Sequence, residues 1–241
     1  NKLNDKNNIV INVYFILSLI IFQSSKITSL IYLYIFRHLS IIKSMKNIAK
    51  QKRSKKRVEI ILQTAKTIIE NKGVDNLTIA EIAKESGLKR TSTYKFIPTV
   101  ESLKELVIID CINDCIDYVK SQNIKFFKDD DLTLVINKIV TSIYSFFESS
   151  DISQKLILKY TLNPPINSSC IHDLGSLIEG EIEKKISLND VFNKSGVCRV
   201  IAQIILAIFS LNAKESGKLN EVGKIEASRA VAAYIKSWLS K

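Results

Sequence analysis

Apolar residues recur at intervals of three and four along most of the chain, and this spacing predicts one helix after another. The first clear case is residues 58–69, where six apolar side chains share one face: Val58, Ile61, Leu62, Ala65, Ile68 and Ile69. Asn71, Lys72 and Gly73 follow this face and predict that the helix ends there.

A short helix is predicted next, beginning after Thr78. A threonine at this position accepts a hydrogen bond from the start of the helix, and Glu81 three residues later completes a capping box. Ile82 faces inward, and Gly87 suits the left-handed conformation in which many helices end.

A second short helix is predicted from about residue 89 or 90 to residue 96, because Pro98 stops it. Two short helices joined by a tight turn with a glycine form a helix-turn-helix unit. The second helix exposes side chains that donate hydrogen bonds to base edges and phosphates. These donors are Lys89, Arg90, Thr91, Ser92 and Lys95.

The rest of the chain is also predicted to be helical, which makes the fold class all-α. The expected helices cover residues 101–122, 132–147, 153–162, 166–186, 197–211 and 222–239. The segment 197–211 is apolar nearly all round, so we expect it to be buried on several sides.

Charge divides the chain more sharply than hydrophobicity does. The 241 residues carry a net charge of +11, with +4 in residues 1–44, +8 in residues 45–100 and −1 in residues 101–241. The run from Lys46 to Arg57 includes Lys55 and Lys56, and it is either a solvated tail or an arm that neutralises phosphates. The helix-turn-helix that follows favours the arm. A basic block beside a neutral body indicates a polyanion-binding module joined to a separate domain.

Residues 1–44 differ from the rest, with apolar runs over residues 9–22 and 27–36. Our preferred interpretation is translated sequence upstream of a start at Met45, the only methionine. A membrane anchor using residues 9–36 and an extra helix packed on the domain are the alternatives. The first run is shorter than the ~20 residues that span a bilayer.

A longer pattern across the helix-turn-helix resembles the tetracycline-repressor (TetR) family of transcriptional regulators. Its positions here are Thr78, Ile79, Ile82, Ala83, Gly87, Leu88, Tyr94, Glu101 and Leu103. The resemblance implies a three-helix DNA-binding domain over residues 45–103 and a helical effector-binding and dimerisation domain over residues 104–241. It also implies a homodimer, formed through the last two helices, that reads a palindromic double-stranded DNA operator.

The resemblance assigns roles to individual residues. Thr78 matches a capping threonine whose hydroxyl often meets a phosphate, and Tyr94 matches a tyrosine that packs and touches the DNA backbone. Lys95 follows where phosphate contacts are common, and residues 89–92 occupy the base-reading stretch. Four positions depart from the family pattern. Lys89 replaces the usual capping Ser or Thr, Thr91 stands where a small residue is common, Ile97 replaces the usual Phe, and Val100 replaces a usual Lys.

The family resemblance also implies a pocket for a small-molecule effector among the central helices. The candidates are Cys111, Cys115, Tyr118, Tyr144, Tyr160 and His172. Each has the alternative of being an ordinary core or surface residue. Cys111 and Cys115 share a helix face, where two thiols would sense oxidants or bind a soft metal, but no third ligand lies at metal spacing.

We expect no catalytic residues, no metal and no cofactor, because the chain lacks GxSxG, GxxxxGK[ST], HExxH and GxGxxG motifs. The sequence therefore predicts a cytoplasmic, ligand-responsive, DNA-binding regulator, more specifically a repressor. The alternative is a membrane-anchored helical regulator or interaction protein that uses residues 9–36.

Overall fold

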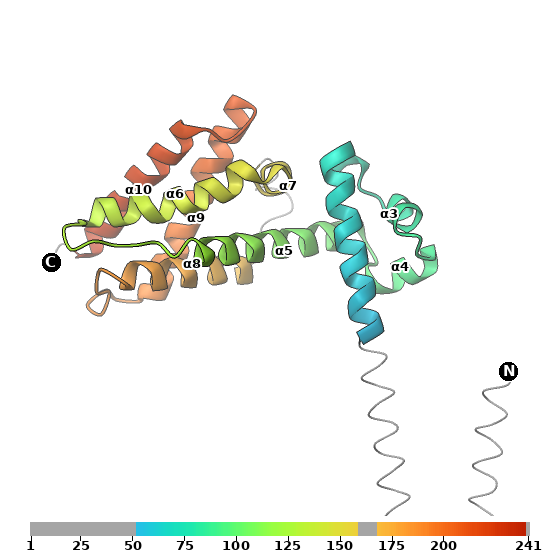
Figure 1. The fold of residues 1–241 in the computed structure, drawn as a ribbon, viewed down its shortest axis with the longest axis horizontal. Coiled ribbons are helices and arrows are strands. Elements are labelled where there is room, and N and C mark those ends of the chain that lie inside the picture. Colours follow the sequence, from blue (N-terminus) through green and yellow to red (C-terminus); the bar gives the residue numbers. More distant parts are fainter. Residues whose placement is uncertain (1–51, 159–167, 240–241) are drawn as a thin grey trace, which may run out of the picture. The chain divides into compact units, whose positions relative to one another are not determined.

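The computed structural model of the chain describes residues 52–158 and 168–239. Residues 58–241 form one compact unit, separate from residues 1–57. Every regular element in the two described ranges is helical, which confirms the predicted all-α fold (Figure 1). The predictions for residues 1–44 and for Tyr160 fall outside these ranges.

The predicted helix-turn-helix is present. A helix covers residues 52–72, and a single 3-10 turn, η1 (Val74–Asn76), separates it from α3 (Ile79–Ser86) and α4 (Arg90–Phe96). Gly87 ends α3 in the left-handed conformation, with φ of 67°. The turn between α3 and α4 is therefore of the kind that the glycine predicts.

Side-chain caps set the helix starts. The Thr78 hydroxyl accepts the N–H of Glu81 at 3.1 Å, and the Thr99 hydroxyl accepts the N–H of Ser102 at 3.0 Å. The other half of the predicted capping box differs, because the carboxylate of Glu81 accepts from the ammonium group of Lys72 at 2.6 Å. A hydrogen bond from a charged donor is stronger than one from a backbone amide. The carboxylate of Glu81 therefore pairs with Lys72 and not with the backbone N–H of Thr78, as a capping box would require.

The rest of the described chain, which we call the body, has five long helices close to the predicted ranges and two short elements. They are α5 (Val100–Ser121), α6 (Leu132–Ser149), α7 (Asp151–Ser153), η2 (Gln154–Leu158), α8 (Ser168–Glu183), α9 (Lys194–Ser216) and α10 (Glu221–Leu239). The segment predicted as one helix from residue 153 differs, since α7 passes into η2, a π-helix. A π-helix interrupts regular α-helical hydrogen bonding and is often found at functional sites.

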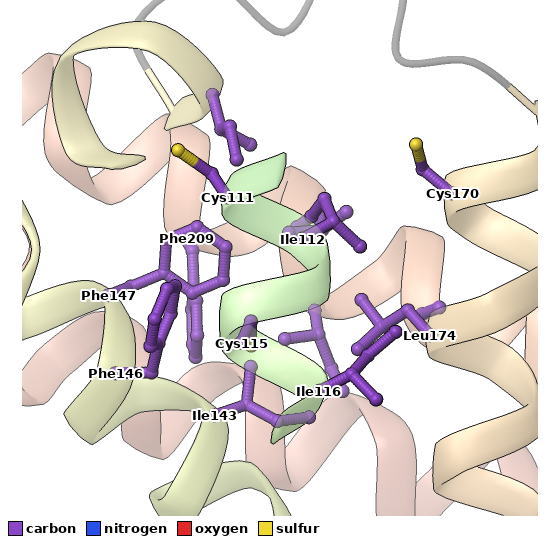
Figure 2. Close-up of a cluster of buried hydrophobic side chains, with 14 of the residues drawn as sticks. Cys111, Ile112, Cys115, Ile116, Ile143, Phe146, Phe147, Cys170, Leu174 and Phe209 are labelled. Atoms are coloured by element: carbon purple, nitrogen blue, oxygen red, sulfur yellow. The ribbon is translucent and has the colours of Figure 1, made fainter. Parts of the chain in front are cut away.

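Aromatic side chains from α6 and α9 form the centre of the body core, against one side of α5 (Figure 2). The rings of Phe147 and Phe209 meet edge to face with centroids 6.2 Å apart, and Phe146 meets Phe147 in the same way at 5.4 Å. Such edge-to-face pairs are a favoured geometry for buried rings. Cys115 and Ile143 are also fully buried in this cluster.

Within the described ranges, one helix, α9, is long and apolar enough to cross a membrane. Half of its most apolar stretch is buried inside the protein, and it packs along both α8 and α10. The other half is at least partly exposed and includes Val200 and Leu211, so the prediction that residues 197–211 are buried on several sides is met on one side only.

Two glycines allow a direct test of the turn before α4. A Cβ atom would meet nothing within 4 Å at either Gly87 or Gly180, but only Gly87 has a positive φ. We expect Gly87→Ala to lower the free energy of unfolding by about 1 kcal/mol, because alanine is strained in this conformation. Gly180→Ala, inside α8, is the matched control and should raise it by roughly 0.5 kcal/mol. Chemical denaturation measures both, and equal effects of the two substitutions would contradict the assignment of Gly87 as the helix end.

Candidate nucleic-acid interface

The inner side of α4 is anchored in the core of the helix-turn-helix. Thr93 and Ile97 are fully buried, and Phe96 is half-buried against the same core. The Thr93 hydroxyl also donates to the carbonyl oxygen of Lys89, at 3.4 Å. This anchoring fixes which side of α4 faces outward.

The outer side of α4 carries the predicted contact residues. Arg90, Thr91, Tyr94 and Lys95 are exposed, whereas Thr93 between them is buried. Arg90 and Tyr94 also touch one another, since the guanidinium lies over the tyrosine ring at 5.6 Å from its centroid. The fold therefore brings cationic and hydroxyl donors together on one short helix.

The other predicted residues occupy separate places. Lys89 is the exposed residue before α4 and makes no side-chain capping bond, as its departure from the family pattern predicts. Ser92 is only half-exposed, and Thr78 is exposed at the start of α3. Lys55 and Lys56 are exposed in the helix over residues 52–72, within the unit that ends at residue 57.

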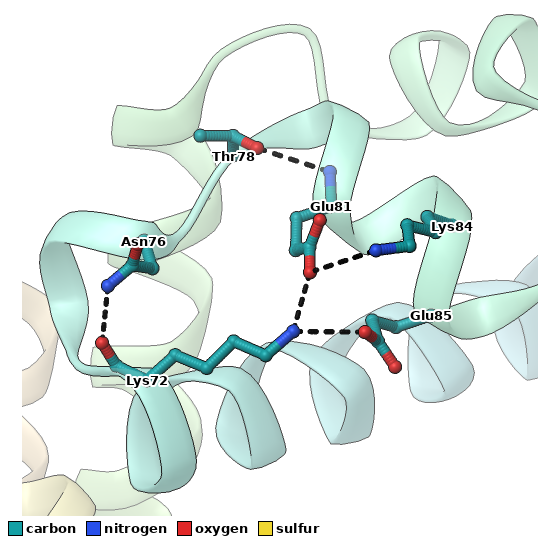
Figure 3. Close-up of polar contacts among 6 residues, drawn as sticks. All are labelled: Lys72, Asn76, Thr78, Glu81, Lys84 and Glu85. Carbon is teal, nitrogen blue, oxygen red and sulfur yellow. Dashed lines mark hydrogen bonds and ion pairs between the residues drawn. The ribbon is translucent and has the colours of Figure 1, made fainter.

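A cluster of charged side chains holds α3 against the preceding helix (Figure 3). The ammonium group of Lys72 donates to Glu81 at 2.6 Å and to Glu85 at 3.0 Å. These hydrogen bonds raise the pKa of Lys72, and the bond from Lys72 lowers the pKa of Glu81. The cluster fixes α3, on which α4 packs.

A second charged contact joins the helix over residues 52–72 to α5, and it was not predicted from the sequence. Lys66 donates to Asp110 at 2.7 Å and to Asp114 at 2.8 Å. Burial lowers the pKa of Lys66, but the two hydrogen bonds outweigh it and raise this pKa well above its usual value. The four-residue spacing of Asp110 and Asp114 was the available signal, because it places both carboxylates on one helix face.

A third contact reaches the end of the same helix from η2. The ammonium group of Lys155 donates to the backbone carbonyl of Glu70 at 3.1 Å and pairs with Asp151 at 2.6 Å. A cation at the C-terminus of a helix is favourable, because the last carbonyls lack partners within the helix. The helix over residues 52–72 is thus joined to both α5 and η2.

The candidate effector residues do not gather at one place. Cys111 and Cys115 are buried in the body core (Figure 2). Tyr144 is also buried, and His172 is exposed on α8. Tyr118 lines an open groove of about 410 Å³ with residues from α5 and α6. The choice among these candidates stays a prediction.

A larger open groove of about 580 Å³ lies between α5 and α8. Its lining includes Asp117 and Lys120 from α5 and Asp173 from α8, with Ile116 and Leu177 as apolar members. Sequence reasoning named none of these residues, because their proximity arises only from the packing of α5 on α8.

The cysteines are poorly suited to redox or metal chemistry in the folded protein. Burial raises the pKa of Cys111 to about 11 and that of Cys198 to about 12, and it also raises those of Cys115 and Cys170. The thiolate is the reactive and metal-binding form. Among the residues that the structure describes, no three His, Cys, Asp or Glu side chains are placed to hold a metal ion.

Comparisons with known proteins identify the fold. No family model and no curated protein match the chain. Solved structures do match it. A TetR-family transcriptional regulator from Streptomyces coelicolor has a TM-score of 0.58 at 14% identity, covering 78% of this chain and 99% of that one.

Two further structures were solved with ligands. RolR in complex with resorcinol has a TM-score of 0.60 at 12% identity, covering 76% of this chain and 89% of that chain. Thermus thermophilus FadR, a TetR-family transcriptional repressor in complex with lauroyl-CoA, has a TM-score of 0.51 at 15% identity, covering 75% and 92%. At these identities the likeness establishes the fold, and the chain has the fold of TetR-family regulators.

Thiol chemistry tests the placement of the cysteines. With a pKa of about 11, the Cys111 thiolate at neutral pH is about 100-fold scarcer than that of an ordinary thiol. All four cysteines are buried, so an aromatic disulfide reagent should react slowly with the folded protein and rapidly in denaturant. Rapid reaction of Cys111 or Cys115 at neutral pH would contradict their burial.

The raised pKa of Cys111 predicts how the free energy of unfolding depends on pH. The pKa of Cys111 is about 11 in the folded state, compared with an ordinary value near 9.0. Unfolded thiols ionise first, so Cys111 contributes stability below about pH 9 that is lost as the pH rises towards 11. Denaturation of the wild type and Cys111→Ala at several pH values measures this loss, which should be smaller in the variant.

Proposed function

We propose that this chain is a sequence-specific DNA-binding transcriptional regulator that acts in the cytoplasm as a homodimer on a palindromic operator. The observation that carries the proposal is α4, whose inner side is fully buried while Arg90, Thr91, Tyr94 and Lys95 are exposed. A short helix presented in this way, in a helix-turn-helix, suits the width of the DNA major groove.

The charge distribution supports a nucleic acid as the partner. Residues 45–100 carry +8, whereas residues 101–241 carry −1. Lysine and arginine side chains that neutralise phosphates release counterions from DNA, which supplies much of the binding free energy. The basic arm that includes Lys55 and Lys56 is proposed to add phosphate contacts.

The last two helices support the proposed dimer. Large apolar side chains remain exposed on both, with Val200 at 42% and Leu211 at 58% on α9, and Val222 at 61% and Ile225 at 49% on α10. Clusters of exposed apolar side chains often mark a protein–protein interface. A second copy of the chain is proposed to cover these side chains in an isologous contact.

The response to a ligand is proposed to depend on the contacts of the helix over residues 52–72. Lys66 binds α5 and Lys155 belongs to η2, so a shift of either body element would pull on the helix over residues 52–72. A ligand that prefers one arrangement of these elements would change the spacing of the two α4 helices in a dimer and weaken operator binding. This is the behaviour of a repressor that a small molecule releases.

The salt dependence of DNA binding tests the role of the exposed lysines. The slope of log affinity against log salt changes by about 0.9 for each phosphate contact. We expect Lys95→Ala to weaken binding to all DNA sequences and to flatten this slope by about one such unit per subunit. Lys218→Ala is the matched control, because Lys218 is exposed in the loop before α10, and it should leave the slope unchanged. An unaltered slope in Lys95→Ala would contradict the assignment of a phosphate contact to this residue.

Sedimentation of a charged variant tests the dimer. We expect the double substitution Leu211→Glu and Ile225→Glu to give a folded monomer, because it would bury four carboxylates in a symmetric contact. Leu134→Glu, at a residue of α6 with 41% exposure, is the control and should remain dimeric. A double variant that is still dimeric would place the interface elsewhere.

A further inference from the structure

Arg90 and Tyr94 form a stacked pair along the exposed side of α4. The guanidinium carbon of Arg90 lies 5.6 Å from the centroid of the tyrosine ring. One terminal nitrogen of the guanidinium, Nη2, donates a long hydrogen bond of 3.4 Å to the tyrosine hydroxyl. The two residues are four apart, so they are neighbours on the helix surface.

The tyrosine has the more restricted side chain of this pair. Its backbone lies next to Thr93, which is fully buried, and three residues before the fully buried Ile97. The tyrosine has two side-chain torsions, whereas a free arginine explores many conformations. Contact with a ring that has few conformations therefore restricts where the guanidinium can point.

The stack leaves most of the guanidinium available for another partner. Arginine has five N–H donors in a planar fork, and the tyrosine hydroxyl accepts from only one nitrogen. Both side chains are exposed, with Tyr94 at 43%. The geometry suits the bidentate contact that an arginine makes with the O6 and N7 atoms of guanine in the major groove.

We propose that Tyr94 is a positioning residue that holds Arg90 for reading one guanine in each operator half-site. This inference rests on the proposed function, because it assigns the base that the DNA-binding helix recognises. It differs from the role that the family resemblance implies for Tyr94, which is contact with the DNA backbone. A backbone contact strengthens binding to every sequence equally, whereas a positioning role changes the preference at one base.

Selection of DNA from a randomised pool, with the full chain, separates the two roles. The wild type should enrich a palindrome with a guanine at one position of each half-site. Arg90→Ala should reduce the preference for this guanine by about 10-fold, within the range for a bidentate base contact. Tyr94→Leu removes the ring but keeps a good helix former, and it should reduce the preference at the same position by about 2- to 5-fold.

Two further variants make the result specific to the stack. Tyr94→Phe retains the ring, so it should recover most of the guanine preference. The double variant Arg90→Ala with Tyr94→Leu should lose no more of the preference than Arg90→Ala alone, because the tyrosine acts through the arginine. Lys95→Ala is the control and should lower affinity without changing the enriched sequence. Thermal unfolding of each variant confirms that it is folded.

The possible failures are distinguishable. A wild-type protein that enriches no DNA sequence overturns the proposed function, and this inference with it. A wild type that enriches a palindrome, with the same guanine preference retained in Arg90→Ala, overturns the inference alone. Loss in Arg90→Ala with no change in Tyr94→Leu also overturns the positioning role. If Tyr94→Leu does not fold, Tyr94→His, which keeps a flat ring without the phenol, replaces it and should show a partial loss.

Discussion

A helix of seven residues cannot hold its own shape in water, so the properties of α4 depend on the packing beneath it. Burial of Thr93 and Ile97 supplies that packing, and α3 supplies the surface on which α4 lies. α3 is itself held by its buried side chains Ile79 and Ile82, and the Thr78 cap and the bonds from Lys72 add contacts at its surface. The exposed side of α4 is thus presented by a supported structure, and this is the condition for any recognition by its side chains.

The same principle links the helix-turn-helix to the body. Lys66 donates to two carboxylates of α5. Near the end of the same helix, the backbone carbonyl of Glu70 accepts from the ammonium group of Lys155 in η2. The side chain of Lys66 is only 14% exposed, so breaking its contacts would leave a largely buried charge without a partner, which favours a small set of discrete arrangements. A body with more than one arrangement of α5 and η2 would thereby offer more than one orientation of α4.

The sequence predicted the parts of the fold that local chemistry decides. Thr78 and Gly87 mark helix ends because the side chain of one and the backbone preference of the other act within a few residues. The spacing of Asp110 and Asp114 signals two carboxylates on one helix face, but their partner Lys66 could not be predicted, nor could the bond from Lys72 to Glu81. Only tertiary packing brings these segments together. The candidate effector residues show the same limit, since aromatic and thiol side chains serve a core as well as a pocket. Here Cys115 and Tyr144 are buried in the core.

The central claim is that the exposed side of α4 faces DNA. Photo-crosslinking tests it most directly, with a photoreactive phenylalanine analogue placed at Thr91 on α4 or at Leu134 on α6, both exposed positions. The account predicts that irradiation of the full chain bound to its selected DNA crosslinks the Thr91 variant and not the Leu134 variant. Bound DNA that crosslinks at Leu134, or that fails to crosslink at Thr91, would contradict the account.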